Sequence, residues 1–251
     1  MATVPRTSVR RDRVIDYPTS DGRPMAETDL HRQDMMDLIQ VLEDRYADEP
    51  DVYVTGNLLL FYVEGQPRTH VSPDVFIARG VPKRPPRDHY KVWLEGKGPD
   101  FVIEVTSKTT RNEDQRKKWA LYRDVLKVPE YFQFDPTEDY LRPSMQGHRL
   151  VGGEYASIEP VEGRLPSLFL GLELERSGTE LRLYDPISRQ RLPTRQERVV
   201  QVTRRLVEER GRTADAENRA EEATRLAADA QAQADRFLRE LEELRRRLSG
   251  G

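Results

Sequence analysis

Apolar positions in the first part of the chain recur at helical spacing. Residues 27–46 (ETDLHRQDMMDLIQVLEDRY) carry apolar side chains three to five positions apart. This spacing predicts an amphipathic helix, and Thr28 or Asp29 can cap its start.

Continuous apolar and β-branched runs follow this helix. They lie at 51–63, 71–78 and 100–107, each bounded by Gly, Pro or Asp, and predict three strands. A second helix is expected from about Arg111 to Leu126, then a short strand in EYFQFD and an irregular β region to about residue 186. The order of helix, strands, helix and strand predicts an α/β core.

Beyond Pro193 and Thr194 the period changes to seven residues. Fifteen seam positions alternate spacings of three and four without a break, and thirteen of them are apolar, which predicts a long C-terminal coiled-coil helix. A single amphipathic helix folded back on the core is the alternative. The seam comprises Val199, Val202, Leu206, Glu209, Thr213, Ala216, Ala220, Ala223, Ala227, Ala230, Ala234, Phe237, Leu241, Leu244 and Leu248.

Composition supports a core with an appendage. Hydrophobic residues make up 36% and charged residues 34%, too polar for one compact body of 251 residues. We therefore expect a flexible basic N-terminus at 1–16, a core domain at 17–193 and the coiled coil at 194–251. Without cysteine, a signal-peptide pattern or an apolar run near 18 residues, the expectation is a cytoplasmic protein with no membrane association.

The net charge of −3 contrasts with the basic surplus usual in nucleic-acid binders. Local basic patches could still bind nucleic acid, and solvated loops explain them equally well. One such patch comprises Lys83, Arg84, Arg87, Lys91 and Lys97.

Two carboxylates interrupt apolar strands: Asp74 in SPDVFIA and Glu104 in FVIEVTS. Buried charges are costly unless they are paired or bind a metal. Neighbouring strands lie about 4.8 Å apart, so one acid from each can share a cation, and these hard oxygen ligands suit Mg²⁺, or Mn²⁺. Asp74 alone could be a turn residue after proline. Asp100 lies nearer in sequence, but four residues along one strand span roughly 13 Å.

The helix after the second carboxylate offers a cation. Asp114, Lys118 and Tyr122 share one face, which can point the lysine ammonium at the metal centre. An ordinary Asp–Lys surface pair is the alternative. Tyr122 and Ser107 are interpreted as partners that orient the ligands. No HxH, CxxC or HExxH pattern occurs, so zinc is not expected.

These motifs together resemble a known family. PDVFIARG, PDFVIEVTSKTT, the D-x-x-x-K-x-x-x-Y of Asp114, Lys118 and Tyr122, and VPEYFQFDP occur in the order of the Uma2 family, over about Tyr17 to Asp185. The resemblance implies a restriction-endonuclease-like PD-(D/E)xK core, with a mixed sheet flanked by helices. The trailing coiled coil is also familiar in that family.

The resemblance also implies roles. Asp74 would be the motif aspartate, Glu104 the second acid and Lys118 a lysine relocated to the helix, because Thr106 stands where the superfamily pattern has lysine. The first helix often adds an acid or a histidine to such sites, and Glu27 and His31 match that position.

The sequence therefore predicts a Mg²⁺-dependent endonuclease acting on DNA. Asp74 and Glu104 would hold the metal, and Lys118 would assist the attacking water. The coiled coil would form a homodimer. A non-cleaving DNA-binding or scaffold protein that acts through the coiled coil is the first alternative, and an enzyme acting on RNA or a branched junction is the second.

Overall fold

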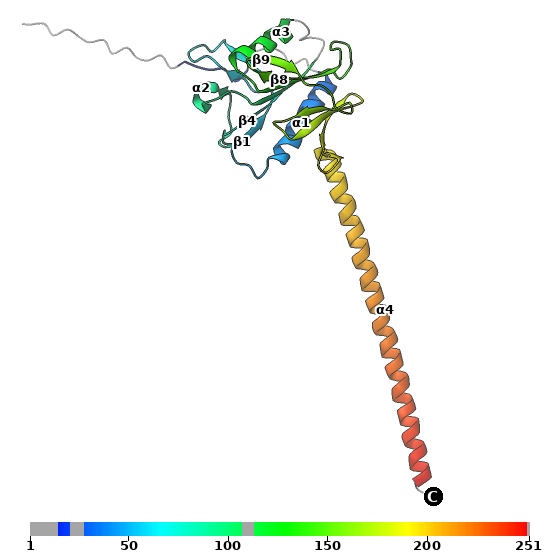
Figure 1. Ribbon diagram of the computed structural model, residues 1–251. Coiled ribbons are helices and arrows are strands. Elements are labelled where there is room, and N and C mark those ends of the chain that lie inside the picture. Colours follow the sequence, from blue (N-terminus) through cyan, green and yellow to red (C-terminus); the bar gives the residue numbers. More distant parts are fainter. Residues whose placement is uncertain (1–14, 21–27, 107–112, 250–251) are drawn as a thin grey trace, which may run out of the picture. The chain divides into compact units, whose positions relative to one another are not determined.

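The computed structural model describes residues 15–20, 28–106 and 113–249, with the backbone alone at 113–115 and 248–249. The chain divides into two compact units, Met1–Arg195 and Gln196–Gly251. A six-stranded sheet forms the centre of the first unit (Figure 1). In spatial order its strands are β1 (Val52–Thr55), β4 (Val75–Arg79), β6 (Phe101–Val105), β7 (Glu130–Phe134), β8 (Met145–Val151) and β9 (Glu154–Ser157).

The sheet is mixed, as the family resemblance implies. β6 and β7 are parallel, and the other neighbouring strands are antiparallel. Parallel neighbours need a crossover connection, which here contains the helix α3 (Glu113–Ala120) and the π-helix η1 (Leu121–Val125). The crossover therefore places helical side chains against the face of β6 and β7.

One face of the sheet packs against the helix α1 (Asp29–Arg45), which contacts β1, β4 and β6. Thr28 caps this helix by accepting a hydrogen bond from the backbone N–H of His31 at 3.2 Å. A second, four-stranded sheet also covers this face and shares its apolar core. Its strands are β10 (Leu165–Ser167), β11 (Leu172–Ser177), β12 (Glu180–Asp185) and β13 (Gln190–Arg191).

The opposite face packs against α3, η1 and a small sheet. Within β4, Val75 and Ile77 join the α1 core, whereas Phe76 and Ala78 join this second core. Because both faces are covered, the strand reads as a continuous apolar run rather than an alternating one. The small elements here are β2 (Leu60–Phe61), β3 (His70–Val71), β5 (Tyr90–Lys91) and the short helix α2 (Val92–Glu95).

Two sequence-based expectations about the strands were wrong. Residues 51–63 form not one strand but β1 and β2, which belong to different sheets. The chain leaves β1 at Gly56 and Asn57, and Asn57 adopts a positive φ of 49°. A Cβ on Gly56 would lie 1.9 Å from the carbonyl oxygen of Asp74, so the close approach requires glycine. The region up to residue 186 is not irregular but contains the antiparallel strands β8 to β12.

The second unit is part of the helix α4 (Arg195–Ser249). This confirms the long C-terminal helix that the seven-residue period predicts. Among the described residues, no helix is long and apolar enough to cross a membrane. The large apolar seam side chains of α4 that the structure describes are 50–66% exposed, namely Val199, Val202, Leu206, Phe237, Leu241 and Leu244.

Candidate active site

Asp74 and Glu104 lie on neighbouring strands at the same level of the sheet. β4 and β6 pair so that Val75 is opposite Ile103 and Phe76 is opposite Val102. Continuing this antiparallel register by one residue places Asp74 opposite Glu104. Side chains directly opposite each other share one face, and here it is the face covered by α3 and η1.

Asp74 is held in place by two donors. Its Oδ2 accepts a hydrogen bond from the backbone N–H of Val105 at 2.8 Å and lies 3.2 Å from His31 Nε2. Burial raises the pKa of the Asp74 carboxyl, but the hydrogen bond with His31 and the positive charge of Lys118 outweigh it, so the pKa lies below its usual value. Asp74 is therefore a carboxylate oriented from two sides.

Glu104 is 5% exposed and accepts hydrogen bonds from two side chains of the crossover. Lys118 Nζ donates to its Oε2 at 2.8 Å, and the Tyr122 hydroxyl donates to its Oε1 at 2.5 Å. Burial raises the pKa of Glu104 to about 7, with Lys118 opposing the shift and the charge of Asp74 adding to it. The two carboxyl groups therefore lie near each other in a buried position, and a bound cation would offset the repulsion between their negative charges.

A π-helical turn positions Tyr122. The expected continuous α-helix changes at Leu121, where the backbone N–H of Leu126 donates to the Leu121 carbonyl five residues earlier at 2.9 Å. Tyr122 is fully buried and its ring lies 5.1 Å from that of Tyr131 on β7. Its hydroxyl consequently points back to Glu104, although the helix changes type between positions 118 and 122.

The structure brings five of the predicted site residues together: His31, Asp74, Glu104, Lys118 and Tyr122. Glu27, Ser107 and the side chain of Asp114 lie outside the described residues. Within the described ranges, no group of three or more His, Asp or Glu side chains is arranged to hold a metal ion.

Two residues that could be confused with site residues have other partners. Asp100 forms an ion pair with Lys97 at 2.6 Å and accepts the backbone N–H of Arg79 at 2.8 Å. Thr106, which stands where the superfamily lysine would be, donates through its hydroxyl to the Phe134 carbonyl at 3.1 Å. Both therefore secure the ends of β6.

Gln133 is a site neighbour that the sequence reasoning missed. It lies on β7 directly beside Glu104 in the parallel β6–β7 register and is 5% exposed. The sequence pattern that identified Asp74 and Glu104 also marks Gln133, because it is a polar residue that interrupts the apolar strand EYFQF.

The mixed sheet flanked by helices, with β6 and β7 parallel and joined by a helical crossover, is the core of the restriction-endonuclease-like class. The chain belongs to the Uma2 family, described as "Putative restriction endonuclease", which matches residues 9–183. This confirms the family to which the sequence motifs point.

Comparison with solved structures finds similar chains, among them a protein of known source. It is a crystal structure described as "a putative nuclease belonging to DUF820" from Anabaena variabilis ATCC 29413, with 14% identity and a TM-score of 0.42, covering 57% of this chain and 75% of that chain. No curated protein matches the sequence.

Proposed function

We propose that this protein is a Mg²⁺-dependent endonuclease that hydrolyses phosphodiester bonds of DNA. Asp74 and Glu104 hold the cation, and Lys118 assists the attacking water. The observation that supports this most directly is the buried Glu104 carboxylate, which faces Asp74 across two strands and receives a lysine and a tyrosine donor.

The donor set fits magnesium. Mg²⁺ is usually bound through one or two carboxylates, with waters and substrate phosphates completing its coordination. Asp74 and Glu104, on the neighbouring strands β4 and β6, would supply these carboxylates. Mn²⁺ accepts similar oxygen ligands and is a possible substitute.

Each residue has a distinct task in the proposed reaction. The bound cation would lower the pKa of a water and neutralise charge on the scissile phosphate. Lys118 carries its ammonium to the Glu104 oxygen, from which it can also orient the water or stabilise charge developing on the phosphate. Tyr122 and His31 orient Glu104 and Asp74, respectively.

Three further residues keep their predicted roles within this proposal. Glu27 precedes in sequence the helix α1, which carries His31, and would add an acid to the site. Ser107 and Asp114 flank the start of the crossover helix and would act as orienting partners. Substitution of Glu27 is the direct test, because a catalytic acid affects cleavage without changing the fold.

We also propose that the helix α4 pairs with a second copy of itself. Its apolar seam positions are exposed in a single chain, and pairing would bury them at roughly 25 cal/mol per Å². Cutting both strands of a duplex uses two active sites, so a dimer suits the proposed activity. The alanine-rich middle of the seam buries little area, which favours a dimer that dissociates on dilution.

A non-cleaving DNA-binding or scaffold protein is the second candidate. The observation in favour of a scaffold is that several basic residues near the sheet stabilise the fold. Arg87 pairs with Glu95 at 2.6 Å, Lys97 pairs with Asp100, and Lys83 donates to the Tyr46 carbonyl. These positive charges are therefore partly paired within the protein and are less available to bind DNA phosphates.

A cleavage assay distinguishes these functions. Plasmid, linear duplex, single-stranded DNA and RNA are incubated with Mg²⁺, with Mn²⁺ and with a chelator, alongside a Glu104→Ala control. Metal-dependent products that disappear in the control support the nuclease. Binding of DNA without products under every metal condition supports the scaffold and excludes the nuclease. Products from RNA alone would change the substrate but keep the site.

A further inference from the structure

The polar row on the site face continues beyond the two acids. β6 and β7 pair in parallel with Glu104 beside Gln133, and β7 and β8 pair with Gln133 opposite Gln146. In-register neighbours point to the same face, about 4.8 Å apart. Phe132 and Phe134, on either side of Gln133, point into the opposite core. The side chain of Gln133 therefore lies beside Glu104, on the side away from Asp74.

The two glutamines differ in their hydrogen bonds. Gln146 Nε2 donates to the Pro143 carbonyl at 3.0 Å, and this side chain is half-buried. Gln133 is 5% exposed, as buried as Glu104, yet among the described residues its carboxamide has no hydrogen-bond partner. Neither its oxygen nor its nitrogen is among the fully buried unpartnered atoms of the described residues, so the carboxamide reaches solvent on the site face, where it can donate to a ligand.

We propose that Gln133 is a substrate-positioning residue whose carboxamide N–H donates to a phosphate oxygen of the bound nucleic-acid strand. The inference rests on the proposed nuclease function and deepens it, because it adds a phosphate-binding group to the site. Glutamine is among the side chains that bind DNA phosphates and fix the register of the strand.

The charges around the site favour such a neutral donor. Asp74 and Glu104 oppose an approaching polyanion, and Lys118 already forms an ion pair with Glu104 at 2.8 Å. A carboxamide supplies a donor without another buried charge, whose desolvation would be expensive. Glu104 and Gln133 both lie next to the last residue of their β-strands, so a nucleic-acid strand bound at this end of β6 and β7 would bring a phosphate oxygen to Gln133.

The test compares three variants with the wild-type full-length chain. Gln133→Met keeps the length of the side chain and removes both polar atoms. Gln133→Glu keeps the shape but replaces the donor by a repelling carboxylate. Gln146→Met is the matched control on the next strand. Affinity for a fluorescent duplex is measured by anisotropy in CaCl₂ under conditions without cleavage, Mn²⁺ affinity by calorimetry, and cleavage kinetics in MgCl₂.

We expect Gln133→Met to weaken duplex affinity by about 10-fold, the value of one hydrogen bond to a charged group. Gln133→Glu should weaken it further, while the duplex affinity of Gln146→Met and the Mn²⁺ affinity of Gln133→Met and Gln146→Met stay at the wild-type level. Duplex affinity and cleavage by Gln133→Met equal to those of Gln146→Met would overturn the inference alone. A loss of Mn²⁺ affinity in Gln133→Met would also overturn it, because the residue would then act on the cation rather than on the phosphate. A wild-type chain that neither binds nor cuts the duplex would overturn the proposed function as well.

Discussion

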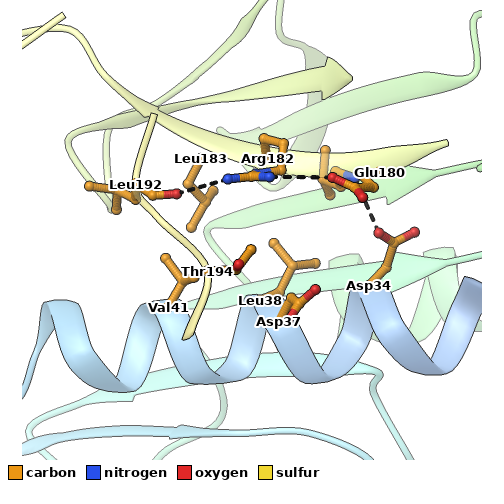
Figure 2. Close-up of a pocket in the computed structure, with 10 residues that line it drawn as sticks. Asp34, Asp37, Leu38, Val41, Glu180, Arg182, Leu183, Leu192 and Thr194 are labelled. Atoms are coloured by element: carbon orange, nitrogen blue, oxygen red, sulfur yellow. Dashed lines mark hydrogen bonds and ion pairs between the residues drawn. The ribbon is translucent and has the colours of Figure 1, made fainter. Parts of the chain in front are cut away.

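The two sides of the central sheet each bury one carboxyl group whose pKa is raised to about 7. On the side of α3 this group is Glu104, and on the side of α1 it is Asp34, which points from α1 toward β12 (Figure 2). Both are 5% exposed, and burial is the largest cause of the shift in each. By burial and pKa alone they would be equal candidates for a catalytic acid.

Their partners differ. Glu104 receives a lysine and a tyrosine and faces a second, oriented carboxylate. Asp34 Oδ1 accepts only the backbone N–H of Leu181 at 3.3 Å, and within the described part of the chain its Oδ2 has no hydrogen-bond partner.

The hollow beside Asp34 between α1 and β12 contains two more acids, Asp37 and Glu180. The nearby Arg182 is directed to Glu180 and to the Leu192 carbonyl, both at 3.3 Å (Figure 2). The arrangement of donors and opposing acids, rather than a shifted pKa, therefore distinguishes a candidate site from a strained structural position.

The largest effect is expected from the acids of the α3 side. Glu104→Ala and Asp74→Asn should each abolish cleavage and cation binding, because one remaining carboxylate holds Mg²⁺ too weakly. Circular dichroism should remain unchanged. Asp34→Asn is the matched control on the other side of the sheet and should cut DNA at the wild-type rate. Full activity in both site variants would remove the metal site from consideration.

Lys118→Ala should lower the cleavage rate by about 10²- to 10⁴-fold, the usual contribution of a positioned proton-transfer or charge-stabilising group. Cation binding should persist because both carboxylates remain. The exposed neighbour Lys117 provides the control, and Lys117→Ala should retain activity. Calorimetry with Mn²⁺ beside single-turnover kinetics separates the two effects. Equal losses in both variants would argue for a general charge effect rather than a specific lysine.

Asp34→Asn should stabilise the fold, and increasingly so as pH rises. The folded-state pKa of about 7 lies above the unfolded value of 3.8, so the unfolded chain releases this proton at lower pH than the folded one. Asp34 therefore lowers the free energy of unfolding as pH rises between these values, and the loss is constant above about pH 7. The variant should therefore gain on the order of 4 kcal/mol over the wild type at pH 8 and little near pH 4. Urea unfolding at both pH values measures the difference. A gain independent of pH would exclude ionisation of Asp34 as its cause.

Removal of α4 should have the smallest effect on the sheet domain. A chain that ends at Arg195 should keep the thermal midpoint of the full protein, because the first unit contains its own core. Sedimentation should show the full chain as heavier than one copy at high concentration. Leu241→Lys in the seam should abolish this association, while Glu243→Lys on the outer side of the helix should not. A full chain that stays monomeric would exclude self-pairing.

The sequence by itself determined the elements whose cause is local or periodic. The spacing of apolar residues and Thr28 specify α1, and the unbroken seven-residue period specifies the continuous helix of α4. The polar interruptions at positions 74 and 104 are visible because a buried strand otherwise excludes charge. Together with the family motifs, these features were sufficient to predict the fold class.

Only the tertiary structure decided which strands pair and what surrounds each buried polar group. The propensity of a segment to form a strand does not indicate which strand it pairs with. Residues 51–63 divide between two sheets at Gly56, where the backbone passes close to Asp74. The neighbour of Glu104 on the other side, Gln133, follows from a pairing across a crossover. The burial of Asp34 follows from β12, 147 residues away in the chain at Leu181. Periodicity encodes which face of an element is buried, whereas long-range packing determines what that face meets.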